Sequence, residues 1–119
     1  MKVLVVDDNH DAATSLSMLV ELLGHEVRTA FDGEQALGVA GEFCPDVVLL
    51  DLGMPRMDGY EACRRLRAQP WGAGMKVVAV TGWGREDDRR KTQLAGFDKH
   101  LVKPVAPGDI ATMLNASFH

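Results

Sequence analysis

Short apolar runs alternate with helical patterns along this chain. Three of the runs are continuous and rich in Val, which is typical of strands buried on both faces of a parallel sheet. They cover Val3–Val6, Val47–Leu50 and Lys76–Val80. Two weaker runs, Glu26–Ala30 and Lys99–Val102, predict further strands nearer the edges of the sheet.

Apolar residues between these runs recur at helical spacing. Gly24 is expected to stop the first of these helices, whose apolar positions are Ala12, Leu16, Leu19, Val20 and Leu23. Asp32 with Gln35 three residues later resembles a capping box, and Asp58 with Glu61 does the same. Each pair predicts the start of a helix.

Two further helices complete the pattern. Pro107 suits the first position of the last one. The segment Arg85–Ala95 has helical composition, but Leu94 and Ala95 are its clear apolar anchors. We therefore expect it to be the least buried helix and the one most able to shift.

Five units of strand followed by helix predict an α/β fold. Strands that alternate with helices form a parallel sheet with helices on both faces, and right-handed crossovers leave few topologies. We expect a doubly wound five-stranded parallel sheet, flavodoxin-like (βα)5, with strand order 2-1-3-4-5. The 119 residues are expected to form one domain, 1–119.

Composition limits the cellular compartment and the classes of partner that we expect. Thirteen basic and seventeen acidic residues give a net charge of −4, which argues against nucleic acid as a partner. No apolar run approaches the roughly 20 residues of a membrane span, and Asp7-Asp8 directly after the first run exclude a secretory signal. We expect a cytoplasmic protein without membrane insertion, in which Cys44 and Cys63 are small buried hydrophobes.

Polar residues stand where the predicted strands end. Asp7 and Asp8 follow the first strand, Asp51 the third, Thr81 the fourth and Lys103 the fifth. Open α/β sheets bind ligands at the carboxyl ends of their strands. These five side chains are therefore predicted to meet in one cleft.

Three carboxylates in one cleft repel each other and are costly to ionise. A divalent cation relieves this repulsion, and oxygen ligands with an open shell suit Mg²⁺. Asp51 can then act as a nucleophile that forms an aspartyl phosphate. Phosphoryl transfer needs positioning and neutralisation of oxygen charge, which the Lys103 ammonium and the Thr81 hydroxyl would supply.

Each residue also has a simpler interpretation. Asp51 and Thr81 are turn formers in many proteins, a Lys before Pro is often solvated, and Asp7-Asp8-Asn9 can cap the first helix. Their joint placement at one edge of the sheet favours the phosphate site.

At these residues the sequence closely resembles the receiver domain of bacterial response regulators and hybrid sensor kinases. The resemblance covers nearly the whole chain and is carried by four motifs in order: Val5-Val6-Asp7-Asp8-Asn9, Asp51-Leu52-Gly53-Met54-Pro55-Arg56-Met57-Asp58-Gly59, Thr81-Gly82 and Lys103-Pro104. The run from Gly96 to Val105 looks most like receivers attached to hybrid kinases.

The resemblance implies a phosphoacceptor and a metal site. Asp51 would take phosphate from a histidine on a kinase or a histidine phosphotransfer protein. Asp8 would ligate Mg²⁺ directly and Asp7 through a water, together with the Asp51 carboxylate and the Gly53 carbonyl. The domain would be no conventional enzyme, since it would catalyse only its own phosphorylation and slow dephosphorylation.

The resemblance also implies a switch. Thr81 would be drawn toward the phosphoryl group, Gly82 would leave the phosphate reachable, and Lys103 would pair with it, aimed by a cis peptide bond to Pro104. The face formed by segment 85–95, the fifth strand and the last helix would shift between pre-existing states. His100 stands where the family often has Tyr or Phe, and is either a pH-sensitive switch or an exposed polar residue with a muted switch.

Other charged residues are expected to be solvated. Arg64, Arg65 and Arg67 predict an exposed helix face, with an acidic partner site as the alternative. His10 either touches the cleft or faces solvent. Few residues follow the last predicted helix, so we expect the chain to act by docking, as a stand-alone regulator or as part of a larger kinase.

Three other functions compete with this one. A haloacid-dehalogenase-like enzyme places its nucleophilic Asp after the first strand with a second Asp two residues on, whereas Gly53 stands two residues after Asp51. A flavin or nucleotide binder needs a phosphate loop after the first strand, where Asp7-Asp8 would repel phosphate. A docking module of the same fold without phosphate control remains the alternative.

Overall fold

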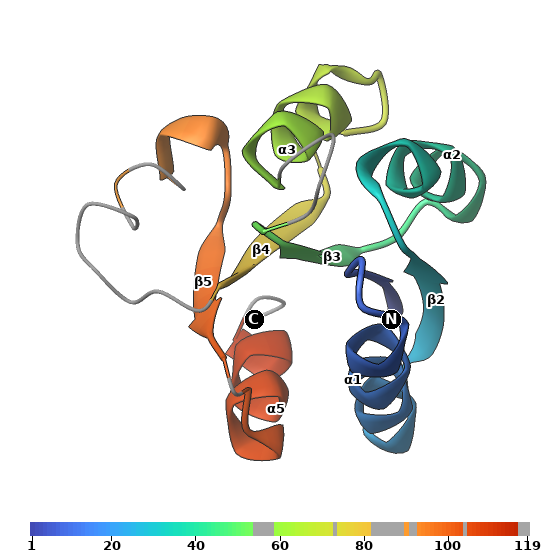
Figure 1. The fold of residues 1–119 in the computed structure, drawn as a ribbon, viewed down its shortest axis with the longest axis vertical. Helices are drawn as coiled ribbons and strands as arrows, with labels where there is room; N and C mark the ends of the chain where they lie inside the picture. The colour runs from blue at the N-terminus through green and yellow to red at the C-terminus, as the bar shows by residue number, and fades with distance from the viewer. Residues whose placement is uncertain (54–58, 73, 82–89, 91–92, 104, 117–119) are drawn as a thin grey trace.

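The computed structural model describes residues 1–53, 59–72, 74–81, 90, 93–103 and 105–116. Within these residues it contains a five-stranded parallel sheet in the order β2-β1-β3-β4-β5 (Figure 1). The strands are β1 (Lys2–Val6), β2 (Glu26–Ala30), β3 (Val47–Asp51), β4 (Lys76–Thr81) and β5 (Lys99–Val102). The predicted fold class and strand order are confirmed, including the two edge strands.

Helices cover both faces of the sheet. α1 (His10–Leu22) and α5 (Pro107–Ala116) pack on one face, and α2 (Gly33–Phe43) and α3 (Gly59–Ala68) pack on the other (Figure 1). Successive strand side chains point to opposite faces. In β1, Val3 and Val5 belong to the core beneath α1 and α5, and Leu4 and Val6 belong to the core beneath α2 and α3. Because both faces are buried, the central strands are continuously apolar.

The predicted capping box of α2 is present, except that the Gln35 side chain bonds to the residue before the N-cap and not to the N-cap itself. The Asp32 carboxylate accepts a hydrogen bond from the Gln35 backbone N–H at 2.8 Å. The Gln35 side chain in turn accepts from the Phe31 N–H at 3.0 Å, one residue before the cap. Asp58, the expected cap of α3, lies outside the described residues.

The ends of the other helices follow the predicted signals. α1 ends at Leu22, two residues before Gly24, which has φ +94°. α5 begins at Pro107. Most of segment 85–95 lies outside the described residues, although residues 93–95 are helical and Leu94 is 83% exposed. Its ability to shift stays a prediction.

Two predictions about individual side chains are wrong. Cys63 is buried as expected, but Cys44 is exposed. Cys44 is the C-cap of α2 and lies in the left-handed region (φ 51°). Arg67 is not part of a solvated face. Its side chain is 22% exposed, against 56% for Arg64 and 51% for Arg65.

In the part of the chain that the structure describes, no helix combines the length and the apolar character that crossing a membrane requires.

Candidate functional site

Three carboxylates meet at the carboxyl ends of the two central strands. β1 and β3 are neighbours, with Val6 opposite Leu50, so Asp7 and Asp51 emerge side by side. One oxygen from each of Asp7, Asp8 and Asp51 lies within 4.8 Å of the others. Asp7 and Asp51 are buried and Asp8 is exposed. The predicted acidic cluster therefore exists in the fold, with one side open to solvent.

Short turns orient the two buried carboxylates. Asp7 Oδ1 accepts a hydrogen bond from the Asn9 N–H at 3.0 Å, and Asp51 Oδ1 accepts from the Gly53 N–H at 3.1 Å. The cap of α1 is Asn9, whose side chain accepts from the Ala12 N–H at 3.1 Å. Since Asn9 caps the helix, the acidic residues are left for another role.

Lys103 reaches this cluster from the far edge strand. Its Nζ lies 3.4 Å from Asp51 Oδ1 and 3.5 Å from Asp7 Oδ2. Its backbone N–H donates to the Thr81 carbonyl at 2.7 Å, which holds the end of β5 to the end of β4. Lys103 keeps 40% of its side chain exposed, but its ammonium pairs with the acidic cluster rather than facing solvent alone. One ammonium faces three carboxylates, so the cluster keeps an excess of negative charge.

The electrostatic strain of the cluster is visible at Asp7. Burial raises the pKa of its carboxyl above the ordinary value, and the Asp51 carboxylate raises it further. The hydrogen bond from Asn9 and the charge of Lys103 lower the pKa, without cancelling the rise. The fold thus holds more negative charge here than its own residues neutralise.

This strain predicts a pH dependence of stability without metal. Between about pH 3.9, the ordinary pKa of Asp, and the raised pKa of Asp7, the folded state binds more protons than the unfolded state. The free energy of unfolding therefore falls as pH rises through this window. Chemical denaturation in chelator at several pH values checks this. Asp7→Asn should remove that part of the slope, and an unchanged slope would contradict the assignment.

Thr81 ends β4 beside the acidic cluster. It is 1% exposed, and it follows Val80, which stands opposite Asp51 in the ladder of β3 and β4. Gly82 and Pro104 lie outside the described residues. The roles predicted for these three residues stay predictions.

His100 lies inside the edge strand β5, opposite Ala79. It is half-buried and its Nδ1 atom is buried, so the alternative of an exposed polar side chain is wrong. His10 is exposed and its ring stacks on Phe31, with centroids 3.8 Å apart and planes 5° apart. Whether His100 switches stays a prediction.

An apolar pocket adjoins the acidic cluster. It has a volume of about 570 Å³ and lies between α1 and the carboxyl ends of β4 and β5. Its lining residues are Asp7, Ala12, Ser15, Leu16, Leu19, Val80, Lys103 and Val105. Leu16 and Leu19 are two of the apolar positions of the predicted first helix, and both also pack against the core beneath α1 and α5.

Comparison with known proteins agrees with this geometry. The family model for the response regulator receiver domain matches residues 3–115. The chain is 34% identical over 114 residues to an uncharacterized 14.6 kDa protein in the sodA1 3′ region of Leptolyngbya boryana, covering 96% of this chain and 87% of that protein. It also matches transcriptional regulators, such as PhoP of Bacillus subtilis (35% over 115 residues, 97% of this chain), but spans 44–47% of their length.

Solved structures show the same likeness. Chemotaxis protein CheY4 of Vibrio cholerae superposes with a TM-score of 0.92 at 30% identity, over 97% of this chain and 96% of that one. The receiver domain of the sensor histidine kinase PA1611 of Pseudomonas aeruginosa gives 0.88 at 31% identity, over 97% and 94%. That structure has a magnesium ion coordinated in its active-site cleft.

Fold and acidic cluster together define a phosphoacceptor signalling module rather than a conventional enzyme. The chain belongs to the response regulator receiver domain family. It is a component of two-component signalling, with an acidic pocket of Asp7, Asp8 and Asp51 that is typical of a phosphoacceptor site.

Proposed function

We propose that Asp51 is the phosphoacceptor of this receiver domain and takes a phosphoryl group from a phosphohistidine. The observation that carries the proposal is that its buried carboxylate lies close to two further carboxylates and 3.4 Å from the Lys103 ammonium. A nucleophile needs a fixed approach to phosphorus and neutralisation of the transferred oxygens. Asp51 has both within reach.

The donor atoms fit a magnesium ion. All three clustered groups are carboxylates, and hard oxygen ligands are those that Mg²⁺ takes in proteins. The pKa of Asp7 is raised because its charged form is unfavourable here, and a bound cation would stabilise that charged form. Asp8, Asp51 and the Gly53 carbonyl would hold the ion directly and Asp7 through a water. When bound, the ion neutralises charge on the phosphoryl oxygens.

The transfer itself is a substitution at phosphorus. An Asp51 carboxylate oxygen forms a bond to the phosphorus atom while the phosphorus–nitrogen bond of the donor breaks, and the imidazole leaves with the electron pair. Lys103 pairs with one of the phosphoryl oxygens and the Thr81 hydroxyl donates to another. The product is an aspartyl phosphate, which carries about −1.5 to −2 charges at this edge of the sheet by analogy with other phosphorylated side chains.

The partner that donates phosphate is a histidine kinase or a histidine phosphotransfer protein in the cytoplasm. The apolar pocket beside the cluster, with Leu16, Leu19 and Val105 in its wall, offers a contact surface to such a protein next to the reacting groups. The new charge draws Thr81 and Lys103 inward, and the face formed by segment 85–95, β5 and α5 shifts with them. That shift is the output of the domain.

The test is formation of an adduct on the intact protein. Incubation with acetyl phosphate or a phosphohistidine protein is expected to add the mass of one phosphoryl group in Mg²⁺ and none in chelator. A matched incubation in Ca²⁺ checks that the requirement is for the smaller ion. Absence of an adduct with both donors, in a protein that binds no Mg²⁺, would favour the phosphate-independent docking module instead.

A further inference from the structure

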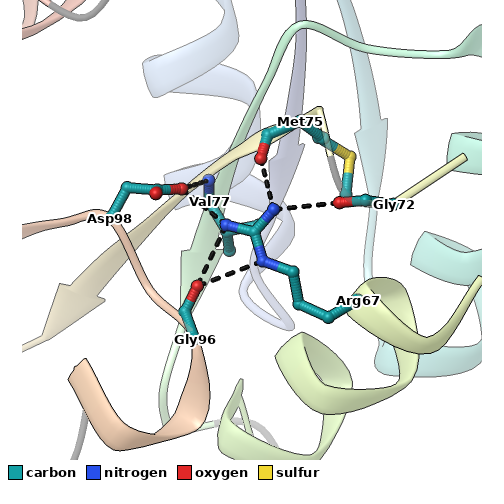
Figure 2. A network of polar contacts seen from close by, with 6 residues as sticks. All are labelled: Arg67, Gly72, Met75, Val77, Gly96 and Asp98. Atoms are coloured by element: carbon teal, nitrogen blue, oxygen red, sulfur yellow. Dashed lines mark hydrogen bonds and ion pairs between the residues drawn. The ribbon is translucent and has the colours of Figure 1, made fainter.

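Arg67, near the end of α3, ties together two segments that are distant in sequence. Its guanidinium donates to the carbonyls of Gly72 at 2.9 Å and of Met75, and to the Gly96 carbonyl at 2.9 and 3.1 Å (Figure 2). It also pairs with the Asp98 carboxylate at 2.5 Å. A single side chain thus joins the loop before β4 to the turn before β5.

Asp98 links Arg67 to strand β4 of the sheet. Its carboxylate accepts a second hydrogen bond from the Val77 N–H at 2.8 Å, and its own N–H donates to the Val77 carbonyl at 2.8 Å. The next pair along the ladder is Val78 with Lys99, the first residue of β5. The contacts of Asp98 therefore fix the point on β4 at which β5 begins.

Asp98 fixes the beginning of β5, and at the other end the Lys103 N–H donates to the Thr81 carbonyl at 2.7 Å. β5 is four residues long, β4 is its one neighbouring strand among the described residues, and both of its end residues are exposed. Register is specified less strongly in such a strand than in a strand with a fully buried face. The five steps from Asp98 to Lys103 contain neither Gly nor Pro and span about 17 Å as a strand. A displacement where β5 begins is therefore passed along a stiff segment to Lys103.

We propose that Arg67 is a positioning residue for Lys103. By fixing where β5 begins, it sets how far the Lys103 ammonium extends toward Asp51 and Asp7, which are now 3.4 and 3.5 Å away. This inference rests on the proposed function of the acidic site. Arg67 lies near the amino ends of β4 and β5, whereas the acidic cluster lies at the carboxyl ends of the strands, so Arg67 touches none of the reacting groups.

A thermodynamic cycle on Mg²⁺ affinity tests the proposal. The Lys103 ammonium competes with the cation for the carboxylates, so Lys103→Ala is expected to bind Mg²⁺ about fivefold more tightly in calorimetry. Arg67→Ala, which lets the ammonium move away, should tighten binding in the same direction. In the Lys103→Ala background, Arg67→Ala should leave the Mg²⁺ affinity unchanged, because its effect passes through Lys103.

Phosphorylation and two further variants complete the design. Arg67→Ala should accept phosphate about tenfold more slowly. Arg67→Lys should behave like Arg67→Ala, because an ammonium lacks the planar fork that binds several acceptors at once. Arg64→Ala is the matched control, since Arg64 lies on the same helix but pairs with the exposed Glu61. Asp98→Asn makes the same test if Arg67→Ala does not fold.

The outcomes separate this inference from the function on which it rests. An equal change of Mg²⁺ affinity in both backgrounds, or a lower melting temperature with no change of affinity, would show that Arg67 has a structural role alone. Wild-type protein that binds no Mg²⁺ and forms no adduct would instead overturn the proposed function, and that result appears before any Arg67 variant is made.

Discussion

Asp51→Asn is expected to abolish the phosphoryl adduct completely and, without metal, to stabilise the fold. The amide keeps an oxygen that can accept from the Gly53 N–H, as Asp51 Oδ1 does at 3.1 Å, but it is no nucleophile. Its neutrality removes repulsion from two carboxylates and loses attraction to one ammonium. Intact mass with donor and Mg²⁺, and thermal unfolding in chelator, measure the two effects.

The stabilisation should amount to about 1 kcal/mol, or roughly 4 °C in Tm for a domain of this size. It should disappear when Mg²⁺ is added, because the wild-type site gains more from the cation than the variant does. Asp32→Asn is the matched control, since Asn caps a helix as well as Asp does and Asp32 caps α2 away from the cluster. An adduct of equal yield in Asp51→Asn would move the phosphoacceptor to another residue.

The acidic cluster could be predicted because its position depends only on where the buried strands end and on which strands are neighbours. A continuous apolar run fixes where a buried strand lies, and the residue after it must emerge at the carboxyl edge. Asp7 and Asp51 follow such runs, and the order β2-β1-β3 makes their strands neighbours. Lys103 required one step more, since its long side chain spans from the edge strand to the centre.

Contacts that depend on tertiary placement escaped the sequence pattern. Arg67 occurs beside Arg64 and Arg65, and spacing on the helix did not show that its guanidinium would meet the carbonyl of Gly96, 29 residues further along. Cys44 was expected inside because of its residue type, whereas it stands exposed at the C-terminal end of α2. Local signals such as the Asp32 cap, by contrast, were found because they act within four residues.

Among the Gly→Ala substitutions in the described part of the chain, Gly72→Ala is expected to be the most destabilising. A Cβ at this buried position would lie 1.9 Å from the Leu66 carbonyl oxygen and 2.9 Å from its carbon. These are backbone atoms at the end of α3, so no rotation of a side chain relieves the contact. The turn from Gln69 to Gly72, closed by a 3.0 Å hydrogen bond, must open instead.

The opening of this turn also withdraws the Gly72 carbonyl from Arg67, so the steric cost adds to the loss of a charge-assisted hydrogen bond. We expect a loss of about 3 kcal/mol in the free energy of unfolding, measured by chemical denaturation. Gly74→Ala is the matched control in the same loop, because nothing lies within 4 Å of its added Cβ, and it should stay within about 0.5 kcal/mol of wild type. Equal stability of the two variants would mean that the chain at Gly72 has room which this geometry denies it, and that the anchor around Arg67 is looser than its hydrogen bonds indicate.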